Sequence, residues 1–391
     1  MPKIAIVAGE ASGDLLGSHL IQALNLQRSD LTFIGIAGPK MVAQGANSLF
    51  PIEKLSVRGY VEVLKHLYGL LRLRKILFKQ LLAAKPALFI GVDAPDFNFW
   101  LERKFKKQNI PAIHYVSPSI WAWRGGRMGK IKRAVSHVLA LFPFEPALYD
   151  AAGVPVTYVG HPLADELPIE PNTHAAREIL KLKQNALVIA MLPGSRQSEV
   201  KQHATLFVKT AHLITAENSQ AQLQGAMFKQ VKFLVPLITR ETRDIFQHAL
   251  HQSFVDYPDV ELDLQILFGH AHDAMEAADI VILASGTATL EAALLKKPMV
   301  ITYRMPVLSW WILKRMRYQA FVGLPNILAG KFLVPELLQN EATPQNLSEA
   351  AKRLLSDTNY LQEIKKEFTK IHISLKQNAA QKAASVILSY L

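Results

Sequence analysis

Short runs rich in valine, isoleucine and leucine recur along the chain of 391 residues, and helical patterns separate them. The runs do not alternate apolar with polar residues, which is typical of strands buried on both faces of a parallel sheet. They are KIAIVAG, TFIGIAG, ALFIGVDAP, AIHYVSPS, HVLALFPF, VTYVGHP, ALVIAMLPGS, VKFLVPL, LQILFG, DIVILASG and PMVITYR. This pattern predicts an α/β fold with helical crossovers and with ligand crevices at the carboxyl ends of the strands.

The chain is longer than one domain usually is, so two doubly wound halves are expected. The join is predicted near residues 165–185, because PLADELPIEPNTHAAREIL contains three prolines and no apolar periodicity before the next helix. We therefore expect Rossmann-like domains at residues 1–170 and 171–345, followed by helices at 346–391. The sequence leaves open whether the last helix packs on either half or on another subunit.

The net charge and the amino-acid composition limit the kinds of partner and site that are expected. Lysine and arginine number 44 against 32 aspartate and glutamate, and the net charge of +12 favours nucleic acid, phosphorylated substrates or an anionic membrane. A basic protein without such a partner is the alternative. The absence of cysteine excludes disulfides, thiolate metal sites and a cysteine nucleophile. No run reaches the roughly 18 apolar residues of a spanning helix, and no signal peptide is evident, so a cytoplasmic protein is expected.

Two loops in the second half have the pattern of a phosphate site. VIAMLPGSRQSEV joins a strand to a helix through Gly194, Ser195 and Arg196, where a helix N-terminus and a guanidinium favour an anion. ILASGTATLEAALL repeats the arrangement with small and hydroxyl residues at 285–289, and Glu291 follows on the first turn. An ordinary helix cap explains the first loop alone, and the helix dipole explains Glu291 alone. Together the loops predict a nucleotide-diphosphate site, and neither matches a Walker loop.

Three polar residues end a strand in the first half. IGVDAPDFN carries Asp93, Asp96 and Asn98, and one carboxylate at this edge can serve as a general base. Asx-turn chemistry around the proline is the alternative. Two aspartates can also hold a divalent cation, but no third ligand stands at a suitable spacing, so no metal is predicted.

Two further segments have an apolar or aromatic face beside basic residues. IHYVSPSIWAWRGGRMGKIKR can stack nucleobases, or it can line a sugar or acyl pocket; tryptophans in a core beside a solvated basic helix are the alternative. VEVLKHLYGLLRLRK, residues 61–75, places its apolar residues on one side of a helix. An ordinary core-facing helix explains this pattern, and a membrane-surface helix whose basic residues reach lipid phosphates is the rival. PVLSWWILKRMRYQ, residues 306–319, is similar.

The glycine-rich stretch AGEASGDLLG, residues 8–17, follows the first strand as a phosphate loop would. It carries Glu10 and Asp14 where an anion would sit, which argues against a phosphate there.

Six segments, in this order, resemble the signatures of the lipid-A-disaccharide synthase family: AGEASGDLLG, GVDAPDFN, HYVSPSIWAW, LPGSR, ASGTATLE and LPNILAG. They span residues 8–330, nearly the whole chain. The first and third are specific to the family, whereas ASGTATLE and PGSR are shared more loosely among glycosyltransferases of the GT-B fold. The resemblance implies two Rossmann-like domains that face each other across a cleft.

The resemblance also implies a reaction. UDP-2,3-diacylglucosamine would donate its sugar, with inversion, to the 6-hydroxyl of 2,3-diacylglucosamine 1-phosphate (lipid X), giving the β(1→6) lipid A disaccharide 1-phosphate and UDP. It implies no metal or other cofactor, and a peripheral protein on the inner face of the inner membrane. Whether the chain forms a homodimer is left open.

The family's functional positions carry over where the motifs match. Asp96 is then the expected general base. The nucleotide-sugar site is expected to comprise Gly194, Ser195, Arg196, Ser285, Gly286, Thr287, Ala288, Thr289, Glu291 and Asn326. The acceptor side is expected to include Glu10, Ser12, Gly13, Asp14, Asn98 and Trp123, with Glu10 and Asp14 either bonding sugar hydroxyls or capping a helix. Membrane contact is expected at Val61, Val63, Leu64, Leu67, Leu70 and Leu71.

Two rival functions stay open at this point. One is another enzyme of the same fold, such as a UDP-sugar epimerase or a glycosyltransferase for soluble sugars. The other is a nucleic-acid-binding protein that uses the basic tryptophan segment. The second rival leaves both diphosphate loops unexplained, so no nucleic-acid partner is predicted.

Overall fold

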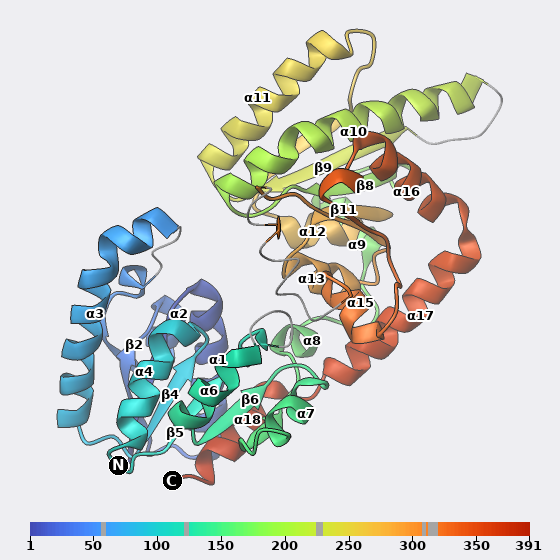
Figure 1. Cartoon of the computed structure of the whole chain (residues 1–391). Coiled ribbons are helices and arrows are strands. Elements are labelled where there is room, and N and C mark those ends of the chain that lie inside the picture. Colours follow the sequence, from blue (N-terminus) through green and yellow to red (C-terminus); the bar gives the residue numbers. More distant parts are fainter. Residues whose placement is uncertain (56–59, 121–124, 224–229, 307–309, 312–319) are drawn as a thin grey trace. The chain divides into compact units, whose positions relative to one another are not determined.

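The computed structural model describes residues 1–55, 60–120, 125–223, 230–306, 310–311 and 320–391 (Figure 1). Of residues 60–67 and 220–223 it describes the backbone only. The chain divides into two compact units, one of residues 1–166 with 374–391 and one of residues 167–373. The chain thus passes from one unit to the other twice, and its last residues return to the first unit.

The first unit is built on a parallel sheet of seven strands in the order β3-β2-β1-β4-β5-β6-β7. The strands are β1 (Lys3–Ala8), β2 (Thr32–Ile36), β3 (Ala46–Phe50), β4 (Leu88–Val92), β5 (Ala112–Tyr115), β6 (His137–Ala140) and β7 (Val156–Tyr158). The helices are α1 (Ala11–Gln27), α2 (Pro39–Ala43), α3 (Tyr60–Ala83), α4 (Pro95–Lys106), α6 (Met128–Ala134), α7 (Glu145–Asp150), α8 (Pro162–Glu166) and α18 (Ala379–Leu388), with short 3-10 turns at Ile52–Lys54 and Gly125–Arg127.

The second unit has a parallel sheet of six strands in the order β10-β9-β8-β11-β12-β13. The strands are β8 (Leu187–Leu192), β9 (Val231–Leu237), β10 (Leu264–Phe268), β11 (Ile280–Ala284), β12 (Met299–Tyr303) and β13 (Glu336–Leu338). The helices are α9 (Thr173–Ile179), α10 (Gln197–Leu223), α11 (Arg240–Asp256), α12 (Ala271–Ala277), α13 (Ala288–Leu294), α15 (Leu324–Ala329), α16 (Pro344–Ser356) and α17 (Thr358–Leu375), with a 3-10 turn at Gln339–Glu341. In Figure 1, α10 and α16 lie on one side of this sheet, and α9 and α12 lie on the other.

Strand order reverses once in each sheet, and this places the crevices. In the first unit the reversal lies between β1 and β4, and in the second it lies between β8 and β11. Loops that leave the carboxyl ends of these two strands diverge to opposite faces and leave a gap for a ligand. The glycine loop and the Asp93–Asn98 segment follow β1 and β4, while the two predicted phosphate loops follow β8 and β11.

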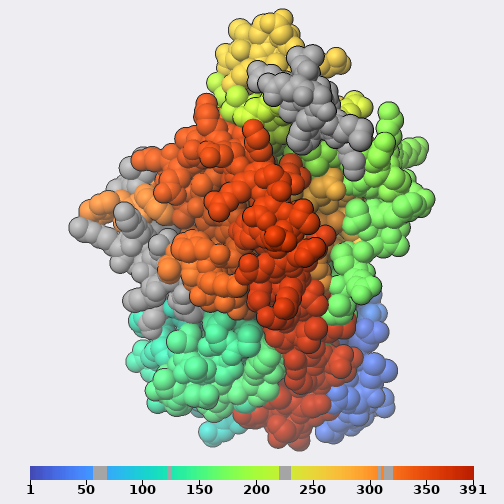
Figure 2. Space-filling model, turned by 90° about the vertical axis from the view of Figure 1, so that its right-hand side faces the viewer, coloured from blue at the N-terminus to red at the C-terminus, as the bar shows by residue number. Residues whose placement is uncertain are grey.

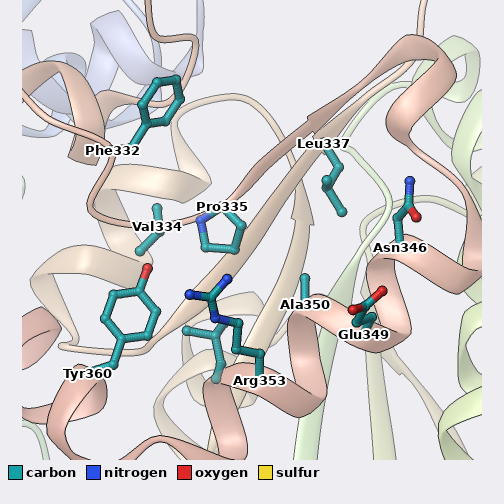
Figure 3. A pocket seen from close by; sticks show the side chains of 10 residues that line it. Phe332, Val334, Pro335, Leu337, Asn346, Glu349, Ala350, Arg353 and Tyr360 are labelled. Atoms are coloured by element: carbon teal, nitrogen blue, oxygen red, sulfur yellow. The ribbon is translucent and has the colours of Figure 1, made fainter.

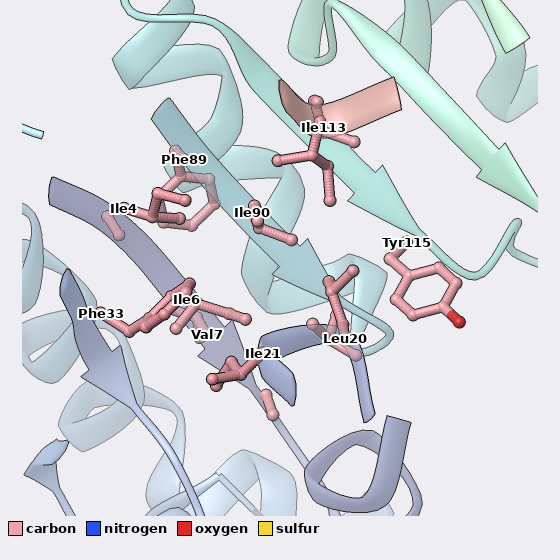
Figure 4. Close-up of a cluster of buried hydrophobic side chains, with 14 of the residues drawn as sticks. Ile4, Ile6, Val7, Leu20, Ile21, Phe33, Phe89, Ile90, Ile113 and Tyr115 are labelled. Carbon is pink, nitrogen blue, oxygen red and sulfur yellow. The ribbon is translucent and has the colours of Figure 1, made fainter. Parts of the chain in front are cut away.

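The core of the first unit confirms that its central strands are buried on both faces. Figure 4 shows side chains of β1 packed among those of β2, β4, β5 and α1: Ile4, Ile6, Val7, Leu20, Ile21, Phe33, Phe89, Ile90, Ile113 and Tyr115. Each large apolar side chain removed from water in this way contributes about 1.5–3 kcal/mol.

The last helix, α18, packs on the first unit. It contacts α1, and its Ala383, Ala384 and Ile387 are buried in the same core as β1. Figure 2 shows the dark red C-terminal residues beside the blue N-terminal ones on this unit. Asp165 fixes the start of the helix, since its carboxylate accepts hydrogen bonds from the amides of Asn378 (2.9 Å) and Ala379 (2.6 Å).

All eleven predicted strands are present, and the structure adds β3 and β13, which the sequence did not indicate. Both are edge strands, with the sequences ANSLF and ELL. A strand paired on one side only needs fewer apolar residues, so its pattern is short and mixed. No helix in the described part of the chain is long and apolar enough to span a membrane.

Candidate active site

A pocket of about 490 Å³ opens at the carboxyl ends of β8 and β11, where the strand order reverses. This volume lies in the range of small-molecule sites. Eight of the ten predicted nucleotide-sugar residues line it: Gly194, Ser195, Arg196, Ser285, Gly286, Thr287, Ala288 and Glu291. The structure therefore brings the two predicted phosphate loops to one pocket.

Glu199, which the sequence analysis did not single out, shapes the first loop. Its carboxylate Oε2 accepts hydrogen bonds from the backbone amides of Ser195 (3.0 Å) and Arg196 (3.2 Å). A first-turn glutamate that reaches back in this way is half of a capping box. Gly194 is required beside it, because its φ of +123° lies in the left-handed region and an added Cβ would stand 2.5 Å from the Cβ of Glu199.

Arg196 is the cationic side chain among the described residues that line this pocket. Its guanidinium is 59% exposed and lies 3.7 Å from Oε1 of Glu199, too far for a strong hydrogen bond. Because Glu199 already occupies the amides of Ser195 and Arg196, a ligand phosphate would meet the guanidinium and the first turn of α10 instead.

The second loop leaves open space for a ligand. No heavy atom lies within 4 Å of where a Cβ on Gly286 would stand, among the contacts that the structure describes. Thr289 is fully buried, and its hydroxyl donates to the carbonyl of Gly286 at 2.7 Å. Thr289 thus stabilises the turn through this hydrogen bond, while residues 285–288 line the pocket.

Glu291 lines the pocket and pairs with a histidine that sequence reasoning missed. Its Oε1 lies 3.2 Å from Nδ1 of His272, the second residue of α12. Nε2 of His272 lies 3.4 Å from Oε2 of Glu276. The hydrogen bond to Glu291 raises the pKa of His272 above its ordinary value; burial opposes this shift, and the charges of Glu291, Glu276 and Asp273 add to it.

The structure does not bring Asn326 to this pocket. Its side chain is fully buried at the start of α15, where Nδ2 donates to the carbonyl of Val334 (2.9 Å) and to Glu336 (2.8 Å). Its Oδ1 accepts from the amides of Leu333 (2.8 Å) and Val334 (2.9 Å). Four hydrogen bonds within residues 326–336 use the whole amide group, so Asn326 ties α15 to the edge strand β13.

We therefore expect Asn326→Ala to act on stability. The substitution leaves buried amides and a carbonyl without partners, which should lower the free energy of unfolding by about 3 kcal/mol. Chemical denaturation measures this loss, with Asn185→Ala, at an exposed position of the same unit, as the control. A variant of unchanged stability that has lost UDP affinity would instead place Asn326 in the nucleotide site.

A second cavity in this unit, of about 430 Å³, lies beside β13 (Figure 3). Figure 3 shows Phe332, Val334, Pro335 and Leu337 on one side, with Arg353 and Tyr360 of α16 and α17 on the other. None of the predicted site residues lines it. The pocket between the two glycine loops is therefore the candidate nucleotide site.

In the first unit, the turn after β4 presents Asp96 to solvent. Asp93 and Ala94 both have left-handed backbone conformations (φ 52° and 44°), and Pro95 then starts α4. The Asp96 side chain is 82% exposed on the first turn, and its Oδ1 lies 3.1 Å from the guanidinium of Arg127. The loop after β1 touches this turn, since a Cβ on Gly9 would stand 2.4 Å from that of Ala94.

Asn98 lies beneath this turn and is fully buried. Its Nδ2 donates to the carbonyls of Asp93 (2.8 Å) and Val7 (3.3 Å), so it joins the ends of β1 and β4. One helical turn further, Glu102 is buried against His114 of β5, with 2.6 Å between the carboxylate and Nδ1. Burial raises the pKa of Glu102, against the opposing effect of His114. These contacts fix the start of α4, and the acceptor role of Asn98 stays a prediction.

The loop after β1, which was predicted on the acceptor side, leads to two differently placed carboxylates. Asp14 is buried, and its oxygens accept from the amides of Lys40 and Met41, each at 3.0 Å. Of the two roles left open for Asp14, the structure shows capping, and the capped helix is α2 rather than its own. Glu10 takes the N-cap position of α1 without a side-chain cap bond; Ser12 is exposed and Gly13 is buried.

The predicted membrane segment forms the helix α3, Tyr60–Ala83. The side chains of Val61, Val63, Leu64 and Leu67 lie outside those that the structure describes, as does Trp123, which was predicted on the acceptor side. Further along α3, Leu70 is half-buried, whereas Tyr68 and Leu71 are 78% and 39% exposed. This part of the helix therefore carries apolar side chains on its solvent face.

No group of three or more His, Cys, Asp or Glu side chains in the described part of the chain is arranged to hold a metal ion.

Comparison with known proteins relates the whole chain to one family. Residues 4–390 match the family model described as lipid-A-disaccharide synthetase. A lipid-A-disaccharide synthase of Methylobacillus flagellatus is 62% identical over 391 residues and covers both chains fully. One of Aromatoleum aromaticum is 53% identical over 389 residues, or 100% of this chain and 96% of the relative.

Solved structures share the fold at low sequence identity. A UDP-GlcNAc 2-epimerase from Neisseria meningitidis, bound to UDP-GlcNAc, has a TM-score of 0.61 at 14% identity, covering 99% of this chain and 98% of that one. The calicheamicin glycosyltransferase CalG4 has a TM-score of 0.59 at 15% identity, covering 100% and 98%. At such identities the likeness concerns the fold alone, and it confirms the predicted pair of GT-B-type α/β units.

Proposed function

The chain belongs to the lipid-A-disaccharide synthetase family, and from this premise we propose how its two units divide the reaction. The second unit binds UDP-2,3-diacylglucosamine by its nucleotide, and the first unit binds lipid X and supplies the base. The observation that carries this proposal is the pocket between the loops after β8 and β11, which eight predicted nucleotide-sugar residues line.

Arg196 and the first turns of α10 and α13 face the diphosphate in this proposal. As the bond between the anomeric carbon and the phosphate oxygen breaks, UDP keeps the electron pair and gains negative charge. A guanidinium and oriented amides that are in place beforehand stabilise such developing charge without reorganisation. Glu291 accepts hydrogen bonds from the ribose hydroxyls, which selects a nucleoside over a simple diphosphate.

Asp96 acts as the general base. It takes the proton of the acceptor 6-hydroxyl while that oxygen attacks the anomeric carbon on the face opposite UDP, and the β(1→6) bond forms with inversion. The exposed position of Asp96 on the first turn of α4 suits this role, because a base must reach a substrate that binds from solvent. The guanidinium of Arg127, 3.1 Å from Oδ1, pairs with the carboxylate at the surface.

A direct assay tests the proposed reaction. Purified protein, radiolabelled UDP-2,3-diacylglucosamine and lipid X are incubated in EDTA, and the products are separated. Disaccharide 1-phosphate together with UDP is the expected result. If folded protein binds UDP but yields no disaccharide, the proposed nucleotide site stands and the proposed acceptor is wrong. The protein would then be an epimerase or a transferase for soluble sugars.

We also propose that the first unit lies on the inner face of the inner membrane, where diacylated substrates reside. Two observations support this. Residues 51–133 contain 17 lysines and arginines against five acidic residues, which accounts for the net charge of the whole chain. The exposed Tyr68 and Leu71 of α3 stand in the same stretch as the exposed Arg72 and Lys75. Apolar side chains next to cations are the pattern of an interfacial helix.

The double substitution Tyr68→Glu and Leu71→Glu should lower partition onto phosphatidylglycerol vesicles by about tenfold or more. Both side chains are exposed, so the fold should tolerate the change. Vesicle flotation measures the bound fraction, and Leu26→Glu with Val255→Glu, two exposed apolar positions elsewhere, is the matched control. Equal flotation of the two double variants would show that α3 does not contact the membrane.

A further inference from the structure

The nucleotide pocket has an unusual charge balance for a diphosphate site. Among its described lining residues, Arg196 is opposed by Glu199 and Glu291. UDP adds the negative charges of its diphosphate to this set. A carboxylate beside a diphosphate lowers affinity unless a cation offsets it. The question is therefore which group offsets Glu291.

His272 is placed to do so. Its imidazole lies between two carboxylates, with Nδ1 at 3.2 Å from Glu291 and Nε2 at 3.4 Å from Glu276. A neutral imidazole carries one N–H, so one of its two nitrogens would present a lone pair to a carboxylate. The imidazolium donates a hydrogen bond to Glu291 through Nδ1, and its positive charge pairs with Glu276 near Nε2. The geometry therefore selects the protonated form, in agreement with the raised pKa of His272.

The other charged groups around His272 have further partners in the structure. Glu276 also accepts a hydrogen bond from the amide of Asn172, at 2.7 Å through Oε1. Asp273, on the same helix, pairs with His270 at 2.7 Å. Glu291 comes from the neighbouring helix α13 and is the partner that lines the pocket. A change in the protonation of His272 therefore acts most directly on Glu291.

We propose that protonated His272 is a positioning residue of the nucleotide site, which holds one oxygen of Glu291 and neutralises its charge so that the other can serve the ribose. This inference rests on the proposed binding of UDP to this pocket. It makes UDP affinity depend on pH. Below the raised pKa of His272 the pair is intact; as the pH rises through that pKa the proton is lost, and Glu291 and Glu276 repel the diphosphate and each other.

Titration of UDP binding against pH tests the proposal. We expect the dissociation constant of the wild-type protein to rise on the order of tenfold between about pH 6.5 and about pH 9. His272→Gln should bind weakly at low pH and converge with the wild type at high pH. His272→Arg, which stays charged, should bind tightly throughout. Comparing variants at each pH removes the titration of UDP itself.

Two further measurements sharpen the result. His270→Asn, a neighbour on the same turn that pairs with Asp273, should follow the wild-type profile. By linkage, addition of UDP should raise the pKa of His272 observed by NMR. Uniformly weaker binding by both His272 variants with no pH-dependent gap would indicate a merely structural role and overturn the proposal, as would equal affinity of His272→Gln and the wild type. Folded wild-type protein that fails to bind UDP at any pH would instead reject the proposed nucleotide site.

Discussion

Replacing Asp96 by asparagine is expected to lower turnover by about 10²- to 10⁴-fold while UDP affinity stays within about twofold, the range typical of a lost general base. Asparagine keeps the shape of the side chain and cannot take a proton. The nucleotide residues all belong to the other unit, so ground-state binding of UDP should not respond. Initial rates at saturating donor and acceptor, with UDP affinity from calorimetry, separate the two effects.

The substitution Asp96→Asn should leave the stability of the fold unchanged as well. The Asp96 side chain is 82% exposed, and water screens its ion pair with Arg127. Asp93→Asn is the matched control, because Asp93 lies between the end of β4 and the start of α4, in the turn that carries Asp96. Loss of turnover in Asp93→Asn together with near-normal turnover in Asp96→Asn would transfer the role of base to Asp93.

The sequence was enough to predict the architecture because the central strands are buried on both faces. Strands such as β4 and β11 are fully buried, and this requirement leaves a continuous apolar run that no turn or surface helix resembles. The edge strands β3 and β13 obey no such requirement and were missed. The partner of α18 was also beyond prediction, since an amphipathic pattern shows that a helix packs but not against what.

The candidate site was predictable where a motif and a strand end coincide. The loops at Gly194 and Gly286 follow neighbouring strands, so their meeting in one pocket follows from parallel topology. Polar residues close to such loops are harder to interpret. A polar side chain after a strand has the same pattern whether it faces a ligand or a buried backbone, and Asp14 and Asn98 prove to face the backbone. Asn326, in α15, likewise bonds the backbone.

The two residues that sequence reasoning missed differ in how they might have been found. Glu199 follows Arg196 by three residues, which is the spacing of a capping box, and that local signal was available. His272 reaches Glu291 across 19 residues and from another helix. Its role depends on how α12 packs beside α13, which only the three-dimensional structure provides.

Arg196→Ala is expected to weaken UDP binding by about 10- to 100-fold, the range for hydrogen bonds to a charged group. The substitution removes the cation of the described pocket lining and leaves Glu199 unopposed beside the diphosphate. Because the guanidinium is 59% exposed, stability should change little. Calorimetric titration with UDP measures the loss. Arg243→Ala, an exposed arginine of the same unit, controls for net charge, and Arg196→Lys should fall between because it keeps the charge without the planar fork. Equal weakening by Arg243→Ala would attribute the effect to long-range charge rather than to this pocket.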